Sequence, residues 1–401
     1  MNSSLPTKDH LEMTTVLLTG ATGFIGGAVL AHGLDSTPDV RWICLVRGSG
    51  AAQARDRLLE NLSRFMDAAA ARHAIRRVEI VVGDITAPAS LEDRRLDAVT
   101  HILHLAADTS FRAQEHCHRV NVEGTRALAE RARRMPGLCR FLYGGTAMIC
   151  GGNPPDLVRE DDAPAPAAEH IVPYTRTKAT TEAMLRHEFA DLPVVMVRPS
   201  IVTGHRSRGC IPSSSIFWMF RAGDRLRLVA GDLDGGIDVV PVDWTAEVLV
   251  GLMLKPELAH DAYHLSAGLR KRTTWSDLAA AFERCDPQGG RRSYSRFDAG
   301  DWKLLRARFQ MAFGLSGPLN VAMLRAMRSY YQFSTLGVAF DNGRLTDEGF
   351  PLPPTLAEYL PACLSAPAGL SIIDQFADDL GMFDGVQESM LPGNLPKSVA
   401  A

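Results

Sequence analysis

Three side chains near the middle of the chain have the types and spacing of a proton-transfer site. Tyr174 and Lys178 are four residues apart, so they share one face of the helix predicted over 174–189. Thr146 follows a predicted strand, 139–143, and offers a hydroxyl. A phenol with a pKa near ~10 is a poor acid at neutral pH, but a neighbouring ammonium favours the phenolate and lowers that pKa. The set predicts acid catalysis by Tyr174 beside Lys178, with Thr146 donating a hydrogen bond to the reacting oxygen.

A glycine-rich stretch near the start of the chain predicts a site for a dinucleotide. Residues 16–19 predict a strand, which runs directly into a glycine series and then into an apolar-periodic helix. In such a unit the glycines allow a tight turn and a close approach of the backbone to a pyrophosphate. The phosphates then lie at the helix N-terminus, where unpaired N–H groups and the positive dipole end face them. The cofactor contacts expected here are Gly20, Thr22, Gly23, Phe24, Ile25 and Gly26.

The end of the next predicted strand indicates which dinucleotide binds. Residues 41–46 read as a buried strand, and Arg47 follows it. An acidic residue at this position holds the ribose 2′-hydroxyl of NAD, whereas an arginine suits the 2′-phosphate of NADP. No Asp or Glu occurs over 41–50, so the sequence predicts NADPH, with Arg55 or Arg57 of a predicted helix, 51–71, adding to the phosphate site. The alternative, a surface arginine that ends a strand, stays open.

Other strand ends predict the rest of the cofactor wall, because ligands bind outside the carboxyl ends of strands in an open parallel sheet. The strands concerned are predicted over 78–82, 99–105 and 194–197. Asp84 is placed to accept a hydrogen bond from an adenine amino group. Asn121 opens a predicted helix that runs to about residue 134, and a plain helix cap is its alternative role. The contacts expected from these positions and from the proton-transfer helix are Asp84, Ile85, Ala106, Ala107, Asn121, Tyr174, Lys178, Pro199, Ser200 and Val202.

These elements predict a Rossmann-like, doubly wound parallel α/β sheet. Six strands with intervening helices lie in the first half of the chain, and this is the economical way to assemble them. Strand-like pieces return at 237–242 and 262–266, but the rest of the second half has helical periodicity and aromatic clusters. We expect two domains: a dinucleotide-binding domain of residues 13–204 plus 236–268, and a smaller, mostly helical substrate-binding lid of residues 205–235 plus 269–390.

Composition argues against several other classes of protein. The 401 residues carry a formal net charge of −3, so the overall charge gives no case for nucleic acid or an anionic membrane. Seven cysteines without a Cys-x-x-Cys pair argue against a disulfide framework or a zinc knuckle and favour a cytoplasmic protein. The apolar runs are too short to cross a bilayer, and residues 1–13 lack the apolar core of a signal peptide. Histidines at 101, 104, 116 and 118 invite a metal hypothesis, but no other ligands complete a site, so no metal is expected.

The motifs, taken together, resemble those of the extended short-chain dehydrogenases/reductases. The similarity is clear over about residues 16–268. One departure is that Gly145 precedes Thr146 where the family usually has a serine, so Thr146 alone must carry the hydroxyl role. The motifs that carry the resemblance are G-A-T-G-F-I-G at 20–26, G-D-I-T at 83–86, N-V-E-G-T at 121–125 and Y-T-R-T-K at 174–178.

A second group of segments is similar, more narrowly, to the thioester reductase and fatty acyl-CoA reductase branch. A faint similarity to the C-terminal part of acyl-CoA reductases follows at 338–344, V-A-F-D-N-G-R. The segments are C-L-V-R-G at 44–48, H-L-A-A-D-T-S-F at 104–111, R-P-S-I-V-T-G at 198–204 and D-V-V-P-V-D at 238–243.

This resemblance implies NADPH-dependent reduction of an acyl thioester. Hydride transfer would give a hemithioacetal that loses thiol and leaves an aldehyde, and a second hydride could take the aldehyde to an alcohol. No adenylation or carrier domain is visible, so the thioester is expected to arrive on coenzyme A or on a carrier protein. The expected channel walls are the loop 151–173 and the segment 213–225. Candidate cations for a phosphate or an acidic carrier helix, with solvated surface charge as the alternative, are Arg206, Arg208, Arg221 and Arg225.

Other functions stay open at this point. A sugar-nucleotide epimerase or dehydratase, or a hydroxysteroid-type dehydrogenase, would share the cofactor half and differ in the lid. A non-catalytic, cofactor-sensing regulator would lack an intact Thr-Tyr-Lys set, which this chain has. Cys150 could in principle form an acyl-enzyme, but nothing beside it resembles an activating base, so we expect a plain loop thiol.

Overall fold

A seven-stranded parallel sheet lies at the centre of the computed structural model, which describes residues 14–109, 114–162, 168–213, 215–286, 290–298, 300–365 and 370–381. The strand order is β12-β7-β5-β4-β1-β2-β3, and every neighbouring pair is parallel. Chain order reverses between β1 and β4, the switch point outside which such sheets bind ligands. The Rossmann-like prediction is therefore confirmed. The strands are Thr15–Thr19 (β1), Arg41–Val46 (β2), Val78–Val82 (β3), His101–His104 (β4), Arg140–Gly144 (β5), Val194–Pro199 (β7) and Ala262–Leu265 (β12).

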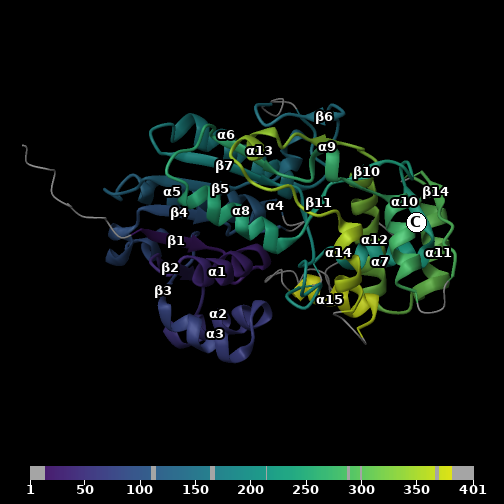
Figure 1. Cartoon of the computed structure of the whole chain (residues 1–401), viewed down its shortest axis with the longest axis horizontal. Helices are drawn as coiled ribbons and strands as arrows, with labels where there is room; N and C mark the ends of the chain where they lie inside the picture. The colour runs from purple at the N-terminus through teal and green to yellow at the C-terminus, as the bar shows by residue number, and fades with distance from the viewer. Residues whose placement is uncertain are drawn as a thin grey trace, which may run out of the picture.

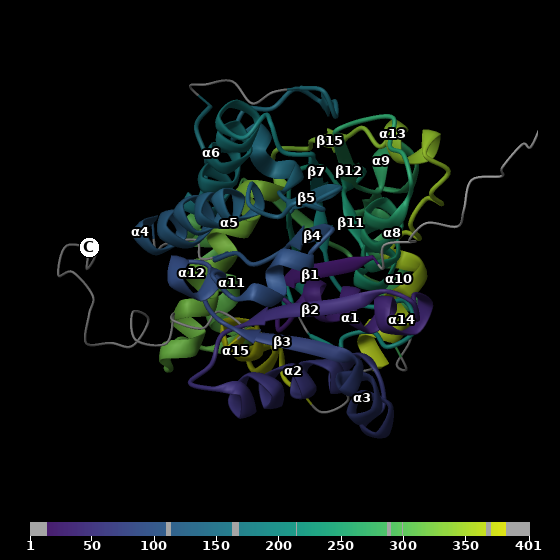
Figure 2. The ribbon, with the colours of Figure 1, turned by 90° about the vertical axis from the view of Figure 1, so that its left-hand side faces the viewer.

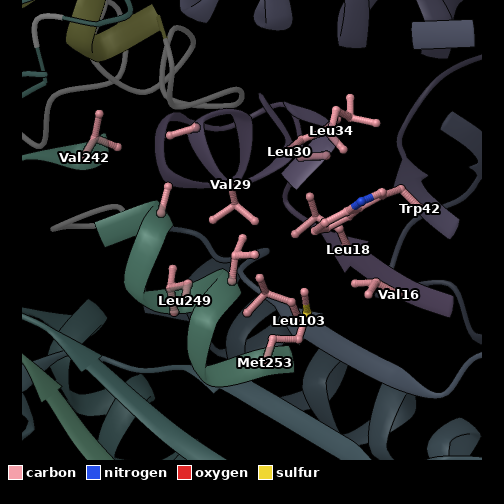
Figure 3. Close-up of a cluster of buried hydrophobic side chains, with 14 of the residues drawn as sticks. Val16, Leu18, Val29, Leu30, Leu34, Trp42, Leu103, Val242, Leu249 and Met253 are labelled. Atoms are coloured by element: carbon pink, nitrogen blue, oxygen red, sulfur yellow. The ribbon is translucent and has the colours of Figure 1, made fainter. Parts of the chain in front are cut away.

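Helices cover both faces of the sheet (Figures 1 and 2). One face carries α1 (Phe24–Ser36) and α8 (Val242–Leu254), and the other carries α5 (Thr125–Ala132) and α6 (Pro173–Glu188). Because both faces are covered, a strand such as β1 is buried along its whole length and reads as a continuous apolar or β-branched run. Figure 3 shows the resulting core, in which side chains of α1 and α8 meet those of the strands beneath them.

Two helix predictions are wrong in their bounds. The helix predicted over 51–71 is broken into α2 (Ala51–Phe65) and α3 (Ala68–Ala74), because the Asp67 side chain accepts hydrogen bonds from the Ala69 and Ala70 N–H groups and caps a new helix. The helix predicted to open at Asn121 begins earlier, at α4 (Gln114–Cys117), and passes through a π-helical segment, His118–Gly124, into α5. Asn121 therefore lies inside a helix and is not its cap.

The second half of the chain adds a mostly helical layer beside the sheet (Figure 1). Its core packs aromatic side chains of α7, among them Trp218, against α11, α12 and α15. Short pairs of strands connect this layer: β8 with β11, β10 with β13 and β9 with β14. The helices are Phe217–Leu226 (α7), Gly268–Lys271 (α9), Trp275–Arg284 (α10), Trp302–Phe313 (α11), Pro318–Ser334 (α12), Leu356–Ser365 (α14) and Ile372–Gly381 (α15). The strands are Ile201–Val202 (β8), Leu228–Ala230 (β9), Gly236–Ile237 (β10), Val239–Val240 (β11), Thr273–Thr274 (β13) and Ser295–Phe297 (β14).

One segment that we assigned to the lid packs on the sheet half. β15 (Ala339–Phe340) pairs with β6 (Leu157–Val158), and α13 (Gly343–Asp347) lies against β12. Glu160, just after β6, accepts hydrogen bonds from the backbone N–H groups of His264 and Arg344, at 2.7 and 2.9 Å. The loop that precedes α6 is thus fastened to the sheet by the C-terminal half. Among the described residues, no helix has both the length and the apolar character needed to cross a membrane.

Candidate functional site

A cavity of about 450 Å³ lies at the carboxyl ends of the strands, on both sides of the switch point between β1 and β4. Residues of the predicted site that are up to 182 positions apart in the sequence, from Gly20 to Val202, meet in this cavity. Its wall contains Thr146 and the expected cofactor contacts Gly20, Thr22, Gly23, Phe24, Ile25, Gly26, Arg47, Arg57, Asp84, Ile85, Ala106, Ala107, Tyr174, Lys178, Pro199, Ser200 and Val202. Asn121 does not line it.

The glycine turn after β1 is packed too closely for side chains. Gly20 has a φ of +78°, and a Cβ on Gly26 would lie 2.1 Å from the Gly20 carbonyl oxygen. Gly23 is the N-cap of α1, which has neither a side-chain cap nor an acidic residue in its first turn. The N–H groups at this helix start have no side-chain acceptor, so they fit a bound pyrophosphate.

Asn61 holds this turn in place, and sequence reasoning missed it. It lies in α2 and is buried, and its Nδ2 donates hydrogen bonds to the carbonyl oxygens of Ala21 at 2.9 Å and Gly23 at 3.1 Å. The signal that could have found it is a polar residue on the buried face of a helix, next to Leu58 and Leu62. Its partner lies 40 residues away, and that pairing is not visible in the sequence.

Two arginines line the cavity near the end of β2. Both Arg47 and Arg57 line the cavity, and Arg57 Nη1 donates a hydrogen bond to the Arg47 carbonyl oxygen at 3.0 Å. Arg55, the alternative second contact, does not line the cavity. At the end of β3, Thr86 donates to Asp84 Oδ1 from its N–H and its hydroxyl, at 2.8 and 2.9 Å, and so orients that carboxylate.

Lys178 and Tyr174 lie near the N-terminus of α6, and both face the cavity. Lys178 Nζ donates a hydrogen bond to the Gly144 carbonyl oxygen at 2.6 Å and lies 5.9 Å from the centre of the Tyr174 ring. Burial lowers the pKa of Lys178 to about 7. Thr146 Oγ1 accepts from the Met148 N–H at 3.3 Å, which leaves its own O–H available to donate.

The lowering of the Tyr174 pKa that we expect from Lys178 is not found; the positive charge of an oxidised nicotinamide ring, the second cause that we expect, would act in addition. Burial raises the pKa of Tyr174 above its usual value, and a smaller Coulombic effect of Cys117 acts in the same direction. Lys178 does not oppose this rise, because burial lowers its own pKa to about 7 and it has lost its charge in the pH range where Tyr174 would ionise. Tyr174 is therefore a protonated phenol, the form that donates a proton.

Asn121 does not line the cavity but supports its wall through hydrogen bonds. Its Oδ1 accepts from the Asp108 N–H at 2.8 Å, and its Nδ2 donates to the Asp108 carbonyl oxygen and to Thr177 Oγ1, at 2.8 and 2.9 Å. Thr177 precedes Lys178 in α6. Asn121 thus ties the segment after β4 to the helix that carries Tyr174 and Lys178.

The helical layer and the segment before it supply the far wall of the cavity; sequence reasoning expected the contribution of 213–225 but missed that of α12 and α15. Asp379 of α15 and Tyr330 of α12 both line it. Nothing in the sequence indicates that a residue 205 positions after Tyr174 returns to the same cavity. The residues contributed by this layer and by the segment before it are Ser213, Ser215, Ile216, Tyr330 and Asp379.

The four candidate cations do not line the cavity. Arg206 forms ion pairs with Asp243, at 2.5 Å, and with Glu247. Arg221 is half-buried and donates a hydrogen bond to the Leu370 carbonyl oxygen at 3.3 Å. Two of the expected arginines therefore already have partners within the fold. Parts of the expected channel walls, residues 163–167 and 214, lie outside the described residues, as do residues 110 and 111 of one motif.

The remaining histidine and cysteine hypotheses can be judged from their contacts. His104 is buried between Thr19 and Thr125, with ring nitrogens 2.6 and 2.8 Å from the two hydroxyls, and burial lowers its pKa to about 3. Burial raises the pKa of Cys150 to about 11, so its thiol stays protonated. No cluster of three or more histidine, cysteine and acidic side chains suited to a metal occurs within the described ranges.

Known proteins with similar sequences include reductases and peptide synthetases. A putative fatty acyl-CoA reductase of Drosophila melanogaster is 27% identical over 285 residues, which cover 61% of this chain and 52% of that protein. A linear gramicidin synthase of Brevibacillus parabrevis is 28% identical over 288 residues, which cover 69% of this chain and 6% of that protein. The chain spans about half the length of the first and a small part of the second.

Solved structures with the same fold include reductase domains and epimerases. The terminal R domain from the myxalamid PKS-NRPS pathway has a TM-score of 0.72 at 24% identity, over 88% of this chain and 90% of that one. A thiolation-reductase di-domain from an archaeal non-ribosomal peptide synthetase has a TM-score of 0.64 at 18% identity, over 89% and 90%. UDP-glucuronic acid 4-epimerase from Bacillus cereus has a TM-score of 0.57 at 17% identity, over 88% and 96%. At these identities the likeness establishes the fold.

A family model shows where the chain belongs. The model described as Male sterility protein, an NAD-binding family, matches residues 18–249, from within β1 to within α8. The resemblance to the thioester reductase and fatty acyl-CoA reductase branch is confirmed by this match and by the relatives. The matched residues make up more than half of the chain and contain nearly all of the cavity's sheet-side wall. The chain therefore belongs to the Male sterility protein family and shares its nicotinamide dinucleotide site.

Proposed function

We propose that the protein reduces an acyl thioester to an aldehyde with NADPH. The observation that carries this proposal is the single cavity that holds Thr146, Tyr174 and Lys178 against the glycine turn. Family membership and a relative described as a putative fatty acyl-CoA reductase support it. Continued reduction of the aldehyde to an alcohol is compatible with the same residues.

In the proposed mechanism the chain's own groups act on the acyl oxygen. NADPH, when bound, supplies a hydride for the acyl carbon. Thr146 donates a hydrogen bond to the acyl oxygen and polarises the carbonyl, and Tyr174 gives that oxygen a proton as negative charge develops on it. The resulting hemithioacetal expels the thiol and leaves the aldehyde. Lys178, held by the Gly144 carbonyl oxygen, orients the nicotinamide ribose hydroxyls beside Tyr174.

The choice of NADPH rests on the arginine pair at the end of β2. Arg57 donates a hydrogen bond to the Arg47 carbonyl oxygen, and both arginines line the cavity. A 2′-phosphate there would gain charge-assisted hydrogen bonds, whereas NADH offers these cations no such group. The roles assigned to the other cofactor contacts, and the division into a dinucleotide-binding domain and a lid, belong to the same proposal.

We also propose that the thioester comes from a carrier protein or from coenzyme A. One relative is a linear gramicidin synthase, and one structural neighbour is a thiolation-reductase di-domain. Since Arg206 and Arg221 have partners within the fold, Arg208 and Arg225 remain as the candidate contacts for the carrier. All seven cysteines are free thiols, which supports the proposed cytoplasmic location.

The experiment that tests this function measures NADPH consumption against acyl-CoAs, pantetheine thioesters, free aldehydes and nucleotide sugars. We expect thioesters to be reduced with release of thiol, and Tyr174→Phe to bind NADPH normally while losing turnover by roughly a hundredfold or more. Turnover of a nucleotide sugar with no reduction of any thioester would instead favour the epimerase or dehydratase alternative. Full activity of Tyr174→Phe on every substrate would remove Tyr174 from its role.

A further inference from the structure

A buried carboxylate closes the lid side of the cavity. Asp379, in α15, is 8% exposed, and its Oδ2 accepts a hydrogen bond from Trp218 Nε1 at 2.9 Å. Burial raises its pKa to about 6, and the exposed Asp378 beside it adds negative charge. Asp379 is therefore mostly ionised at neutral pH.

No cation within the described part of the chain pairs with this carboxylate. Its hydrogen-bond partner there is the neutral indole of Trp218, and it forms none of the salt bridges seen elsewhere in the fold. A buried carboxylate without a positive partner is costly, since burial removes its hydration and the one hydrogen bond from Trp218 replaces only part of it. Because Asp379 lines the cavity, a bound molecule can supply the missing positive charge.

Aromatic side chains hold the carboxylate in position and extend the site. The Trp218 ring meets Tyr330 edge-on at 5.6 Å between centroids and Phe376 edge-on at 4.8 Å. Tyr330 also lines the cavity and lies close enough to Asp379 for the carboxylate to raise the pKa of its phenol. An anionic oxygen next to an aromatic ring is the arrangement that binds ammonium groups, through charge-assisted hydrogen bonds and cation–π attraction.

We propose that Asp379 and Tyr330 form a subsite for a protonated amine in the acyl part of the substrate. This inference rests on the proposed thioester reduction and narrows it: the acyl group carries an ammonium group, as in aminoacyl or peptidyl thioesters, and is not a plain hydrocarbon chain. A purely aliphatic acyl group would leave the Asp379 carboxylate buried without a positively charged partner. The carboxylate selects the substrate and takes no part in the chemical step near Tyr174.

The test compares matched pairs of pantetheine thioesters that differ in one terminal group, an amine or a methyl, over a series of chain lengths. At the best-fitting length we expect kcat/KM to favour the amine by roughly tenfold or more, the scale of a charge-assisted hydrogen bond. Asp379→Asn keeps an acceptor for Trp218 but removes the charge, so it should abolish the preference by lowering kcat/KM for the amine series. Asp378→Asn removes a charge outside the cavity and should keep the preference.

A binding measurement separates this inference from the proposed reaction. In the presence of NADPH, primary alkylammonium ions should bind to the unmodified protein more tightly than alkanols of equal length, and Asp379→Asn should remove that difference. Reduction of both series with equal efficiency, or a preference that survives in Asp379→Asn, would overturn the amine subsite while leaving thioester reduction intact. If neither series is reduced, the proposed reaction is wrong, and the comparison of alkylammonium binding with alkanol binding still decides the subsite.

Discussion

Lys178 should make the protein more stable as the pH rises above neutrality. Burial holds the pKa of this lysine at about 7, whereas an unfolded lysine has a pKa near ~10.4. Between these two values the unfolded chain binds more protons at this site than the folded chain does. Stability therefore increases with pH over this window, and integration from pH 7 to pH 9 gives about 2 kcal/mol.

The measurement is urea unfolding of the unmodified protein and of Lys178→Met at pH 7, 8 and 9, without added cofactor. The variant also loses the hydrogen bond to the Gly144 carbonyl oxygen, but that loss of ~1 kcal/mol does not depend on pH. We expect the free energy of unfolding of the unmodified protein, relative to the variant, to rise by about 2 kcal/mol from pH 7 to pH 9. Lys303→Met, on the exposed side of α11, controls for the loss of one positive charge. A constant difference between the unmodified protein and Lys178→Met would show that the buried lysine keeps its proton, and the reasoning from burial would be refuted.

Three further predictions concern the cofactor and the core. The unmodified protein should bind NADPH more tightly than NADH, and Arg47→Ala should remove most of that difference; equal dissociation constants in the unmodified protein would contradict the arginine argument. Gly26→Ala should abolish dinucleotide binding, measured by calorimetry, because its Cβ would lie 2.1 Å from the Gly20 carbonyl oxygen; unchanged affinity would show that the turn can relax. Glu182→Leu leaves Arg198 buried without its carboxylate partner at 2.5 Å, so the free energy of unfolding, measured with urea, should fall by ~3–5 kcal/mol. A decrease below ~1 kcal/mol would mean that the arginine finds another partner.

The parts of the site that depend on local sequence could be predicted. A strand, a glycine turn and a helix follow one another within a few residues, so Gly20, Gly23 and Gly26 could be placed before the structure was known. Tyr174 and Lys178 are likewise neighbours on one helix face, and both line the cavity. Arg47 follows its strand directly, and the parallel sheet then requires these strand ends to meet.

The parts that depend on long-range packing could not be predicted. Asn61 and Asp379 reach the site from helices that the sequence places far from the residues they contact. Asn121 looked like a helix start because the π-helical segment that contains it, His118–Gly124, has no recognisable sequence signal. The pKa of Tyr174 was expected to fall because a sequence shows a neighbouring lysine but does not show how deeply both groups are buried.

The most direct test of the central claim follows the hydride itself. NADPH carrying deuterium at the transferred position of C4 is mixed with an acyl thioester in a single turnover, and the products are analysed by mass spectrometry. Reduction in the cavity of Tyr174 and Lys178 predicts an aldehyde with one deuterium at its carbonyl carbon, released together with one thiol, and slower formation of the same product by Tyr174→Phe. Oxidation of the labelled cofactor without deuterium in any aldehyde or alcohol derived from the acyl group would contradict it.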